Sequence, residues 1–471
     1  MKRIVIDPVT RIEGHAKITI HLDDAGQVTS TQFHVTQVRG FEKFVEGRPF
    51  YEMPGITARI CGICPISHLM ASAKACDAIM AVRIPPAAAW LRELIHCGQF
   101  VQSHALSFFH LSAPDLLLGM DSDPARRNVL GLAAKHPELA QDGIALRKFG
   151  QRIIEAVAGE RVHPSGIVPG GIGQPLDPEI REEILMGLAP ARDIARKTLQ
   201  LFKGTLDQFA DEVAHFGAME TMYAGLVDAA GALHLYDGAI RFQDAGGAVV
   251  QTVAAERYAD AIGEAALRDT YLKAPYFKPR GYPGGIYRVG PLARLNVADH
   301  LGTPAADAEL AEYRQRFGRV VASSFHYHYA RLIEIVYALE RIRILLDTPG
   351  ILDTHVRARA SVNALEGIGV AEAPRGILIH HYKVDEQGAM KWANLVIATG
   401  HNNLAINRSV EQVSKRYVHG DKLEEGMLNR VSAVVRAYDP CLSCSTHASG
   451  LTPLRIELLD AGGRLLDEIA T

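Results

Sequence analysis

Two Cys-x-x-Cys pairs near opposite ends of the chain constrain its fold more than any other feature. Cys61 and Cys64 form the first pair, in the segment Arg-Ile-Cys-Gly-Ile-Cys. Cys441 and Cys444 form the second pair, in Asp-Pro-Cys-Leu-Ser-Cys. A local zinc knuckle brings its pairs from neighbouring stretches of sequence, whereas these pairs bracket most of the protein. We therefore expect the chain to fold so that all four thiolates meet at one buried metal centre.

The spacing of the cysteines does not choose the metal. Sulfur ligands suit zinc, an iron–sulfur cluster, nickel or iron. A structural Zn(Cys)₄ site, a dithiol redox pair and unrelated core cysteines are the alternatives. Cys76 and Cys97 lie outside both pairs, and free cysteine often behaves as a small buried apolar residue, so we assign them no function.

Composition excludes several classes of protein. The 471 residues carry a net charge of −3 with both signs mixed, which does not favour a nucleic acid or an anionic membrane as partner. We find no signal peptide and no apolar run of the roughly 18 residues that a membrane span needs. Six cysteines in so long a chain are not a disulfide scaffold. We expect a cytoplasmic protein in a reducing setting.

Hydrophobic periodicity predicts a mainly helical fold. Pro65–Met80 is rich in small residues and begins with proline, which suits the first turn of a helix. Ala87–Leu111 has the pattern of a core helix. Asp177 is a good N-cap for helical sequence that extends towards Phe216, in two helices, and another helix is predicted from Thr303 to about Leu346. A large helical bundle follows from these long segments.

β-Type segments occupy the remainder. Lys2–Ile6, Ala16–His21 and Val28–Val35 predict a small N-terminal antiparallel sheet. Ala218–Ala298 is Gly-rich and is expected to be a surface excursion. Further strands are predicted at Leu233–Tyr236, Ala239–Gln243, Ala248–Val250, Gly376–Tyr382, Asn394–Thr399, and in a C-terminal hairpin at Pro453–Leu459 and Arg464–Ile469. The predicted class is α+β, a long-helix bundle core with minor β appendages and no internal domain boundary.

Residues that flank the cysteines carry a family resemblance. Arg-x-Cys-Gly-x-Cys-x-x-x-His at 59–68 and Asp-Pro-Cys-x-x-Cys-x-x-His at 439–447 resemble the two motifs of the large, catalytic subunit of [NiFe] hydrogenases. The resemblance runs almost end to end and includes Asp-Pro-x-x-Arg-Ile-Glu-Gly-His at 7–15, Arg-Gly-Phe-Glu at 39–42 and Glu-Ala-Pro-Arg-Gly at 372–376. The cysteine motifs and His-His-Tyr at 380–382 look most like the soluble, NAD-reducing (bidirectional) branch.

The resemblance implies reversible heterolytic cleavage of H₂ at a nickel–iron centre whose iron carries CO and cyanide. By this resemblance Cys61 and Cys441 are terminal ligands of nickel. Cys64 and Cys444 then bridge nickel and iron. The proton released from H₂ passes to Cys441 and then to Glu13.

The same resemblance assigns further charged residues to the site. Arg375 matches the arginine whose guanidinium lies over the open metal position, and Asp77 and Asp439 match acids that orient it. We expect Glu13 to be buried beside thiolates with a raised pKa, which suits a proton relay. The alternatives are that Glu13 pairs with Arg11 or caps a turn, and that the two aspartates have N-cap or surface roles.

A second group of residues lines the cofactor. Thr399 matches the residue that donates a hydrogen bond to an iron-bound cyanide, although Ala398 stands where many relatives have proline. His68 is expected to donate to a cysteine sulfur rather than to bind metal, and Pro374 belongs to the same pocket.

A hard cation, usually Mg²⁺ in this family, completes the implied site. Glu42 and His447 match two of its ligands, and the carbonyl of Leu395 matches a third. Carboxylate and carbonyl oxygens suit Mg²⁺. The alternative for Glu42 is a solvated surface acid.

The implied organisation is one domain, residues 1–447, and a C-terminal extension, residues 448–471. In the resembled family an endopeptidase removes such an extension after nickel insertion, so the full chain is expected to be an unprocessed precursor. We expect Cys441 and Cys444 to be displaced from Cys61 and Cys64 in that form.

The implied partners follow from what the chain lacks. The sequence has too few cysteines for iron–sulfur clusters of its own and no trustworthy dinucleotide motif. We expect an iron–sulfur small subunit, NADH-dehydrogenase (diaphorase) subunits that hold FMN and NAD, the maturation endopeptidase and nickel chaperones. The alternatives are a deazaflavin-reducing hydrogenase, a non-catalytic homologue like the related subunit of respiratory complex I, and a zinc-binding interaction protein.

Overall fold

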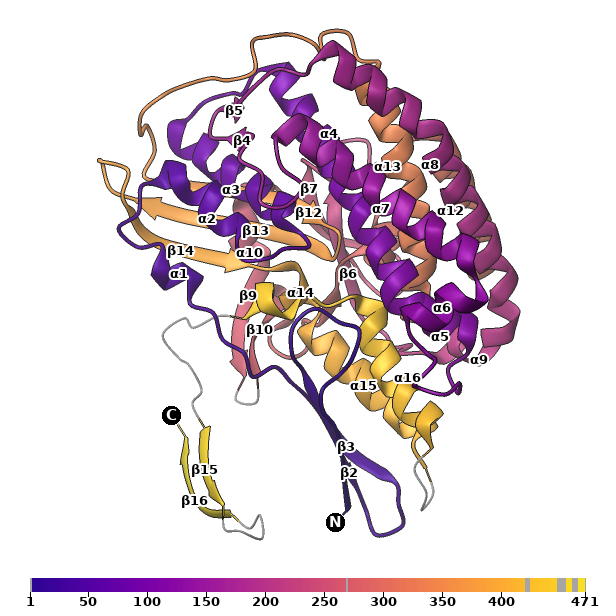
Figure 1. Cartoon of the computed structure of the whole chain (residues 1–471). Helices are drawn as coiled ribbons and strands as arrows, with labels where there is room; N and C mark the ends of the chain where they lie inside the picture. Colours follow the sequence, from indigo (N-terminus) through magenta and orange to yellow (C-terminus); the bar gives the residue numbers. More distant parts are fainter. Residues whose placement is uncertain (1, 268–269, 420–423, 447–454, 460–464, 471) are drawn as a thin grey trace.

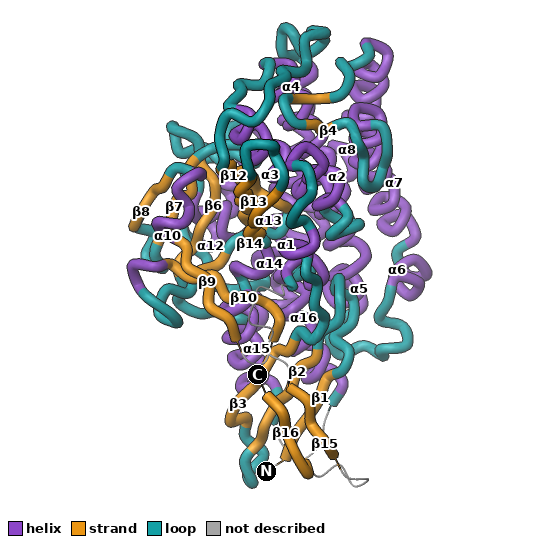
Figure 2. Tube along the Cα trace, turned by 90° about the vertical axis from the view of Figure 1, so that its left-hand side faces the viewer, coloured by secondary structure: helices purple, strands orange, loops and turns teal. Residues whose placement is uncertain are grey.

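Long helices form one side of the molecule, and small sheets form the other (Figures 1 and 2). The protein is described here by a computed structural model, which places residues 2–267, 270–419, 424–446, 455–459 and 465–470. The α-helices are α1 (Phe41–Phe44), α2 (Met53–Ala58), α3 (Pro65–Met80), α4 (Pro86–Ala105), α5 (Ala113–Leu118), α6 (Val129–Lys135), α7 (Pro137–Ala158), α8 (Pro178–Thr205), α9 (Ala210–His215), α10 (Tyr258–Ala261), α11 (Pro291–Val297), α12 (Pro304–Phe317), α13 (His326–Leu346), α14 (Ala398–His401), α15 (Asn403–Tyr417), α16 (Glu425–Tyr438) and α17 (Leu442–Ser445).

The bundle of α4, α7, α8 and α13 carries the main core, with α12 packed on α13 (Figure 1). Two glycines allow α4 and α7 to approach closely. A Cβ atom added to Gly150 would lie 2.5 Å from the Gly98 carbonyl oxygen, and one added to Gly98 would lie 3.0 Å from the Gly150 oxygen. Because α4 is buried along nearly its whole length, its polar side chains point into the interior rather than to solvent.

The strands form several small sheets. The sheet nearest α3 is antiparallel, in the order β12-β13-β14, and another has the order β11-β6-β7-β8. The strands are β1 (Lys2–Ile6), β2 (Lys17–Leu22), β3 (Val28–His34), β4 (Ile167–Val168), β5 (Gly171–Ile172), β6 (Met222–Val227), β7 (Ala239–Gln243), β8 (Val249–Val253), β9 (Ile262–Leu267), β10 (Thr270–Phe277), β11 (Tyr287–Arg288), β12 (Glu366–Ala373), β13 (Gly376–Val384), β14 (Met390–Val396), β15 (Arg455–Leu459) and β16 (Leu465–Ala470).

Glycines in β12 allow the sheet to lie directly on α3. A Cβ atom at Gly369 would lie 1.9 Å from the Ala71 carbonyl oxygen, and one at Gly367 would lie 2.1 Å from that of Ala75. The small residues predicted for α3 therefore serve a contact between helix and sheet. The turn between β12 and β13 is tight, since Ala373 pairs with Gly376 and only Pro374 and Arg375 lie between them.

The predicted fold class is confirmed: helices dominate, and the sheets are small. The N-terminal antiparallel sheet, helix α3 with its predicted bounds and the C-terminal hairpin β15–β16 are all present. Among the described residues, no helix is both long and apolar enough to cross a bilayer.

Several predicted bounds are wrong. The helix expected from Thr303 to Leu346 is two helices, because α12 ends before Gly318, whose φ is +92°. The helix expected to reach Leu111 leaves the α geometry after Ala105 and continues as a π-helix, Leu106–Ser112. β14 ends at Val396, so Thr399 lies in α14 rather than in a strand.

The prediction of a surface excursion at Ala218–Ala298 is also wrong. β6 is buried along its whole length and lies between β7 and β11, against α11. Leu233–Tyr236 is not a strand. The prediction omitted α7, α15, α16 and β12, whose positions depend on partners distant in sequence.

Candidate metal centre

Four cysteine sulfurs converge at one buried point. Cys61 and Cys64 precede α3. Cys441 immediately precedes α17, and Cys444 lies within that helix. The Cys61 and Cys441 sulfurs are 3.3 Å apart, the Cys64 and Cys444 sulfurs 3.6 Å, and the Cys441 and Cys444 sulfurs 2.8 Å. All four lie within 4.8 Å of one another, and none is in a disulfide. The expected displacement of Cys441 and Cys444 is therefore wrong.

The loop of the first cysteine pair is held by donors from several elements. The N–H groups of Ile63 and Cys64 point at the Cys61 sulfur, at 3.2 and 3.4 Å. On α4, the side-chain amides of Gln99 and Gln102 both donate to the Ile63 carbonyl, at 2.8 and 2.7 Å. The buried polar face of α4 therefore fixes the cysteine loop, and sequence periodicity alone did not reveal it.

The pKa values of the cysteine thiols are shifted in opposite directions. Burial raises the pKa of the Cys441 and Cys444 thiols well above the ordinary value. Hydrogen bonds from Cys441, Cys444 and Cys61, in that order, lower the pKa of Cys64 well below it, and a bond from His68 adds to this. A cluster of soft sulfur donors closed off from water fits nickel, iron or zinc.

Glu13 lies beside the second cysteine pair. The Ser443 N–H donates to its carboxylate at 3.0 Å, and the Leu442 N–H donates to its carbonyl at 3.1 Å. Gly14 has φ +87°, and a Cβ atom there would lie 2.7 Å from the Leu442 Cβ. The expected burial of Glu13 is corrected, because its side chain is only half-buried. Arg11 turns away from Glu13, so the alternative of a Glu13–Arg11 pair is not found.

Arg375 occupies the turn between β12 and β13 and faces the sulfurs. Its guanidinium donates to the Asp439 carbonyl at 2.5 Å and to the Asp439 carboxylate at 3.0 Å. Burial would lower the pKa of Arg375, but Asp439, followed by Cys441, raises it above the ordinary value. The side chain is therefore a fixed positive charge next to the cysteine cluster.

Asp77 does not orient Arg375. Its carboxylate accepts from Arg92 at 2.6 Å and from the Gly170 N–H at 2.6 Å. These partners join α3 to α4 and to the loop before β5. Ser103 instead contacts Arg375, at 3.4 Å. The sequence did not single out Ser103, since a serine in a core helix carries no motif of its own.

The remaining predicted pocket residues are buried near the cluster. Thr399 accepts the Cys441 N–H on its hydroxyl oxygen at 2.9 Å, which leaves the hydroxyl proton available to a ligand. A ring nitrogen of His68 lies 3.1 Å from one of His380. The Pro374 carbonyl accepts from Arg294 at 3.0 Å.

The structure describes two of the three residues expected at the hard-cation site. Glu42 is buried, which does not fit the alternative of a solvated surface acid. It lies in α1, which packs on β14, where Leu395 is also buried. His447 lies outside the described residues.

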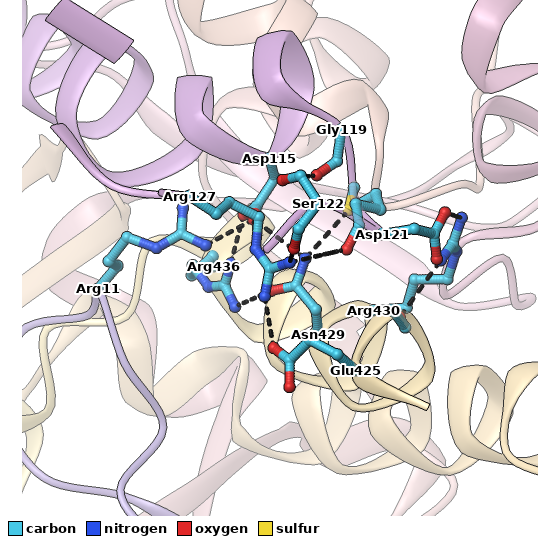
Figure 3. A network of polar contacts seen from close by, with 12 residues as sticks. Arg11, Asp115, Gly119, Asp121, Ser122, Arg127, Glu425, Asn429, Arg430 and Arg436 are labelled. Carbon is cyan, nitrogen blue, oxygen red and sulfur yellow. Dashed lines mark hydrogen bonds and ion pairs between the residues drawn. The ribbon is translucent and has the colours of Figure 1, made fainter. Parts of the chain in front are cut away.

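A cluster of arginines around Asp115 anchors the segment that carries Glu13 (Figure 3). Arg11 donates to the Asp115 carboxylate at 2.5 Å, and Arg127 and Arg436 pair with the same carboxylate. Burial alone would raise the pKa of Asp115, but Arg436 and Arg11 lower it below the ordinary value. These ion pairs tie the N-terminal loop to α5 and α16.

Asp115→Asn should lower the free energy of unfolding by about 3 kcal/mol at neutral pH, because it leaves buried guanidinium groups without their carboxylate. The folded-state pKa of Asp115 is depressed, so this stabilisation exists above the unfolded pKa of about 4 and is lost as pH falls through the folded pKa. Denaturant titrations of both proteins from pH 7 to pH 3 measure it. A difference that does not narrow below about pH 4 contradicts the prediction.

Comparison with known proteins agrees with this site. A family pattern described as nickel-dependent hydrogenase matches residues 39–158 and 232–447, and one described as HoxL-like matches residues 3–38. The chain therefore belongs to the nickel-dependent hydrogenase family, as an oxidoreductase with the fold of the large [NiFe] hydrogenase subunit.

Individual relatives cover nearly the whole chain. It is 41% identical over its full length to the NAD-reducing hydrogenase HoxS subunit beta of Cupriavidus necator, of which 99% is covered. Over 88% of its length it is 43% identical to a subunit of the F420-non-reducing hydrogenase vhu of Methanocaldococcus jannaschii, again with 99% covered.

Solved structures show the same fold. The structure of an NAD⁺-reducing [NiFe]-hydrogenase in the H₂-reduced state superimposes with a TM-score of 0.92 at 44% identity, covering 95% of this chain and 100% of that one. The Ni-Fe-Se hydrogenase of Desulfovibrio vulgaris Hildenborough gives a TM-score of 0.77 at 25% identity, with the same coverage of each chain.

Proposed function

We propose that this chain is the catalytic subunit of an NAD-reducing hydrogenase, which cleaves H₂ reversibly and passes electrons through a small subunit to NAD⁺. The observation that carries the proposal is the set of four buried sulfurs within 4.8 Å, flanked by Glu13 and Arg375. The similarity to HoxS subunit beta along the whole chain supports the choice of acceptor.

The donor set fits a nickel–iron centre. Cys61 and Cys441 would hold nickel terminally, and Cys64 and Cys444 would bridge it to iron. When bound, this centre, with CO and cyanide on the iron, supplies heterolytic cleavage of H₂. Thiolate donation makes the metals electron-rich.

The residues around the sulfurs supply charge and proton handling. Arg375 presents a fixed guanidinium charge, which polarises a small molecule held nearby at no reorganisation cost. Cys441 accepts the released proton on its sulfur, and Glu13 takes it onward. The Ser443 N–H orients the Glu13 carboxylate, and the half-exposed position of that side chain gives the proton a way out.

Electrons must leave through partner proteins. Cys76 and Cys97 are buried but are not among the sulfurs that lie within 4.8 Å of one another, and burial raises the pKa of both thiols. They do not form a cluster-binding set. NADH-dehydrogenase subunits with FMN and an iron–sulfur small subunit therefore complete the enzyme, which works in the cytoplasm.

The alternatives receive less support. Relatives named F420-non-reducing hydrogenase do not favour a deazaflavin-reducing enzyme. A complex I-like homologue without catalysis does not need the four cysteines, which this chain retains and brings together.

We propose that a magnesium ion lies beside this centre, bound by the Glu42 carboxylate, the Leu395 carbonyl and His447. The burial of Glu42 next to β14 supports the proposal, because a buried carboxylate is stable as an ion when it binds a hard cation.

Residues 448–471 are a segment removed on maturation, after nickel chaperones have delivered the metal. The family pattern ends at residue 447, and the solved NAD⁺-reducing chain is matched completely by 95% of this one. Co-expression with the dedicated endopeptidase should give a chain ending at His447 in intact-mass spectrometry. A full-length chain that holds nickel and is active contradicts this processing.

The function is tested on protein co-expressed with its maturation proteins and partner subunits. We expect nickel, iron in excess of nickel because the partner subunits hold iron–sulfur clusters, infrared bands of CO and cyanide, H₂/D⁺ exchange and H₂-dependent reduction of NAD⁺. Zinc in place of nickel, with no exchange, would instead identify a structural zinc site.

A further inference from the structure

Arg294 of α11 is buried, and its guanidinium donates hydrogen bonds to a single group of neighbouring residues. A guanidinium has five N–H groups in a planar fork. Five hydrogen bonds run from it: to the two Glu334 carboxylate oxygens at 2.6 and 2.7 Å, to Glu372 at 2.7 Å, and to the carbonyls of Ala373 and Pro374, both at 3.0 Å. Arg294 therefore contacts three successive residues that lead directly to Arg375.

Glu334 of α13 connects Arg294 to a second group that contacts Arg375, the Ser103–His104 pair of α4. Its carboxylate lies 2.8 Å from the Nε2 atom of His104. Burial lowers the pKa of His104 to about 4, so the neutral ring donates this hydrogen bond from Nε2. His104 follows Ser103, whose hydroxyl lies 3.4 Å from the Arg375 guanidinium.

One ion pair thus links both sides of the catalytic arginine. Arg294 holds the backbone just before Arg375. Ser103 of α4 contacts the Arg375 side chain, and its neighbour His104 is held by Glu334. Glu334 and Arg294 are both fully buried. A buried ion pair usually adds no more net stability than apolar side chains of similar volume would. The groups that this pair holds in place therefore say more about its role than the stability it adds.

We infer that Arg294 and Glu334 are positioning residues, which set where the Arg375 guanidinium lies relative to the cysteine sulfurs. The inference rests on the proposed function for its catalytic consequence. Its structural content, an anchored segment 372–375, concerns this chain alone.

Arg294→Lys is the main test, and Arg92→Lys is its matched control. Arg92 is equally buried, pairs with Asp77, and donates to the Val168 and Gly171 carbonyls and to the Tyr236 hydroxyl. None of these hydrogen bonds reaches segment 372–375. Both changes keep the charge and remove the planar fork. Both should lower thermal stability.

Backbone deuterium uptake in the full-length, metal-free chain tests the anchoring by itself. We expect Arg294→Lys to increase uptake in peptides that cover residues 372–378. Arg92→Lys should increase it around residues 168–171 instead. Unchanged uptake at 372–378 in Arg294→Lys overturns the inference.

H₂/D⁺ exchange in the nickel-loaded complex tests the consequence. Misplacing a reacting group by about 1 Å can reduce a rate by about 100-fold, so we expect Arg294→Lys to lose about 10- to 100-fold at unchanged nickel content. Arg92→Lys should change exchange by less than about 2-fold. Combined with Arg375→Lys, the Arg294→Lys change should add little further loss, because both act through one group.

Each outcome decides one claim. Equal losses of exchange in Arg294→Lys and Arg92→Lys would mean a general effect of instability and would overturn the inference. If Arg294→Lys does not fold, Glu334→Gln, which keeps the side-chain shape, replaces it in both measurements. Wild-type protein without exchange contradicts the proposed function, while the uptake comparison still decides whether Arg294 anchors the segment.

Discussion

Cys64→Ala should abolish nickel binding and H₂/D⁺ exchange while the chain still folds. Cys64 supplies one of four sulfurs that meet within 4.8 Å, and its pKa is the one lowered by the other three thiols. In the proposed centre Cys64 would bridge nickel and iron, so its loss would remove one donor from each metal. Because enzymatic acceleration usually exceeds about 10⁶-fold, exchange should fall by at least about 10⁴-fold. Elemental analysis and mass-spectrometric exchange assays measure both effects.

Cys97→Ala is the matched control for that change. Cys97 is also a fully buried free thiol, in α4, and burial raises its pKa. The Cys97→Ala variant should keep its metal content and its H₂/D⁺ exchange, with a modest loss of stability from the small cavity. Normal nickel content in Cys64→Ala, or equal loss in Cys97→Ala, would contradict the four-sulfur centre.

Glu13→Gln should suppress H₂/D⁺ exchange by about 10²- to 10⁴-fold, the usual contribution of a positioned acid or base. The amide can still accept the Ser443 N–H through its oxygen, so the loop should keep its conformation. It cannot take up a proton at neutral pH, however. Nickel and iron content should therefore match the wild type while exchange falls.

Asp7→Asn provides the comparison for Glu13→Gln. Asp7 lies in the same N-terminal loop, but its carboxylate is 45% exposed and pairs only with His15 among the contacts described. Exchange should stay within about 2-fold of the wild type, as expected for a surface charge away from the reaction. Exchange at the wild-type rate in Glu13→Gln would place the proton relay on another residue.

Local sequence was a reliable guide to single elements. Proline at the first position and a run of small residues identified α3 with its bounds, since both properties act within the helix. The break between α12 and α13 was missed although Gly318 marks it, because the apolar pattern continues across the gap. β6 was missed because its burial comes from β7, β11 and α11 rather than from alternation within its own residues.

For the candidate site, sequence identified the sulfur donors and the charged residues that follow a motif. It did not identify Ser103, Gln99, Gln102 or Arg294, which carry no motif and act through α4 and α11. It also paired Asp77 with the wrong arginine. Asp77 lies in α3, directly after the first cysteine motif, but proximity to a motif does not determine which guanidinium a carboxylate meets.

The amino-acid sequence by itself determined what chemistry is available here: four soft sulfur ligands, a carboxylate and a guanidinium, because these properties belong to the side chains. Only the tertiary structure decided which groups meet. Cys61 and Cys441 are brought to 3.3 Å across most of the chain, and Arg375 is directed to Asp439 rather than Asp77. The physical reason is that such contacts depend on how α3, α4 and the β12–β13 turn pack, which no local pattern encodes.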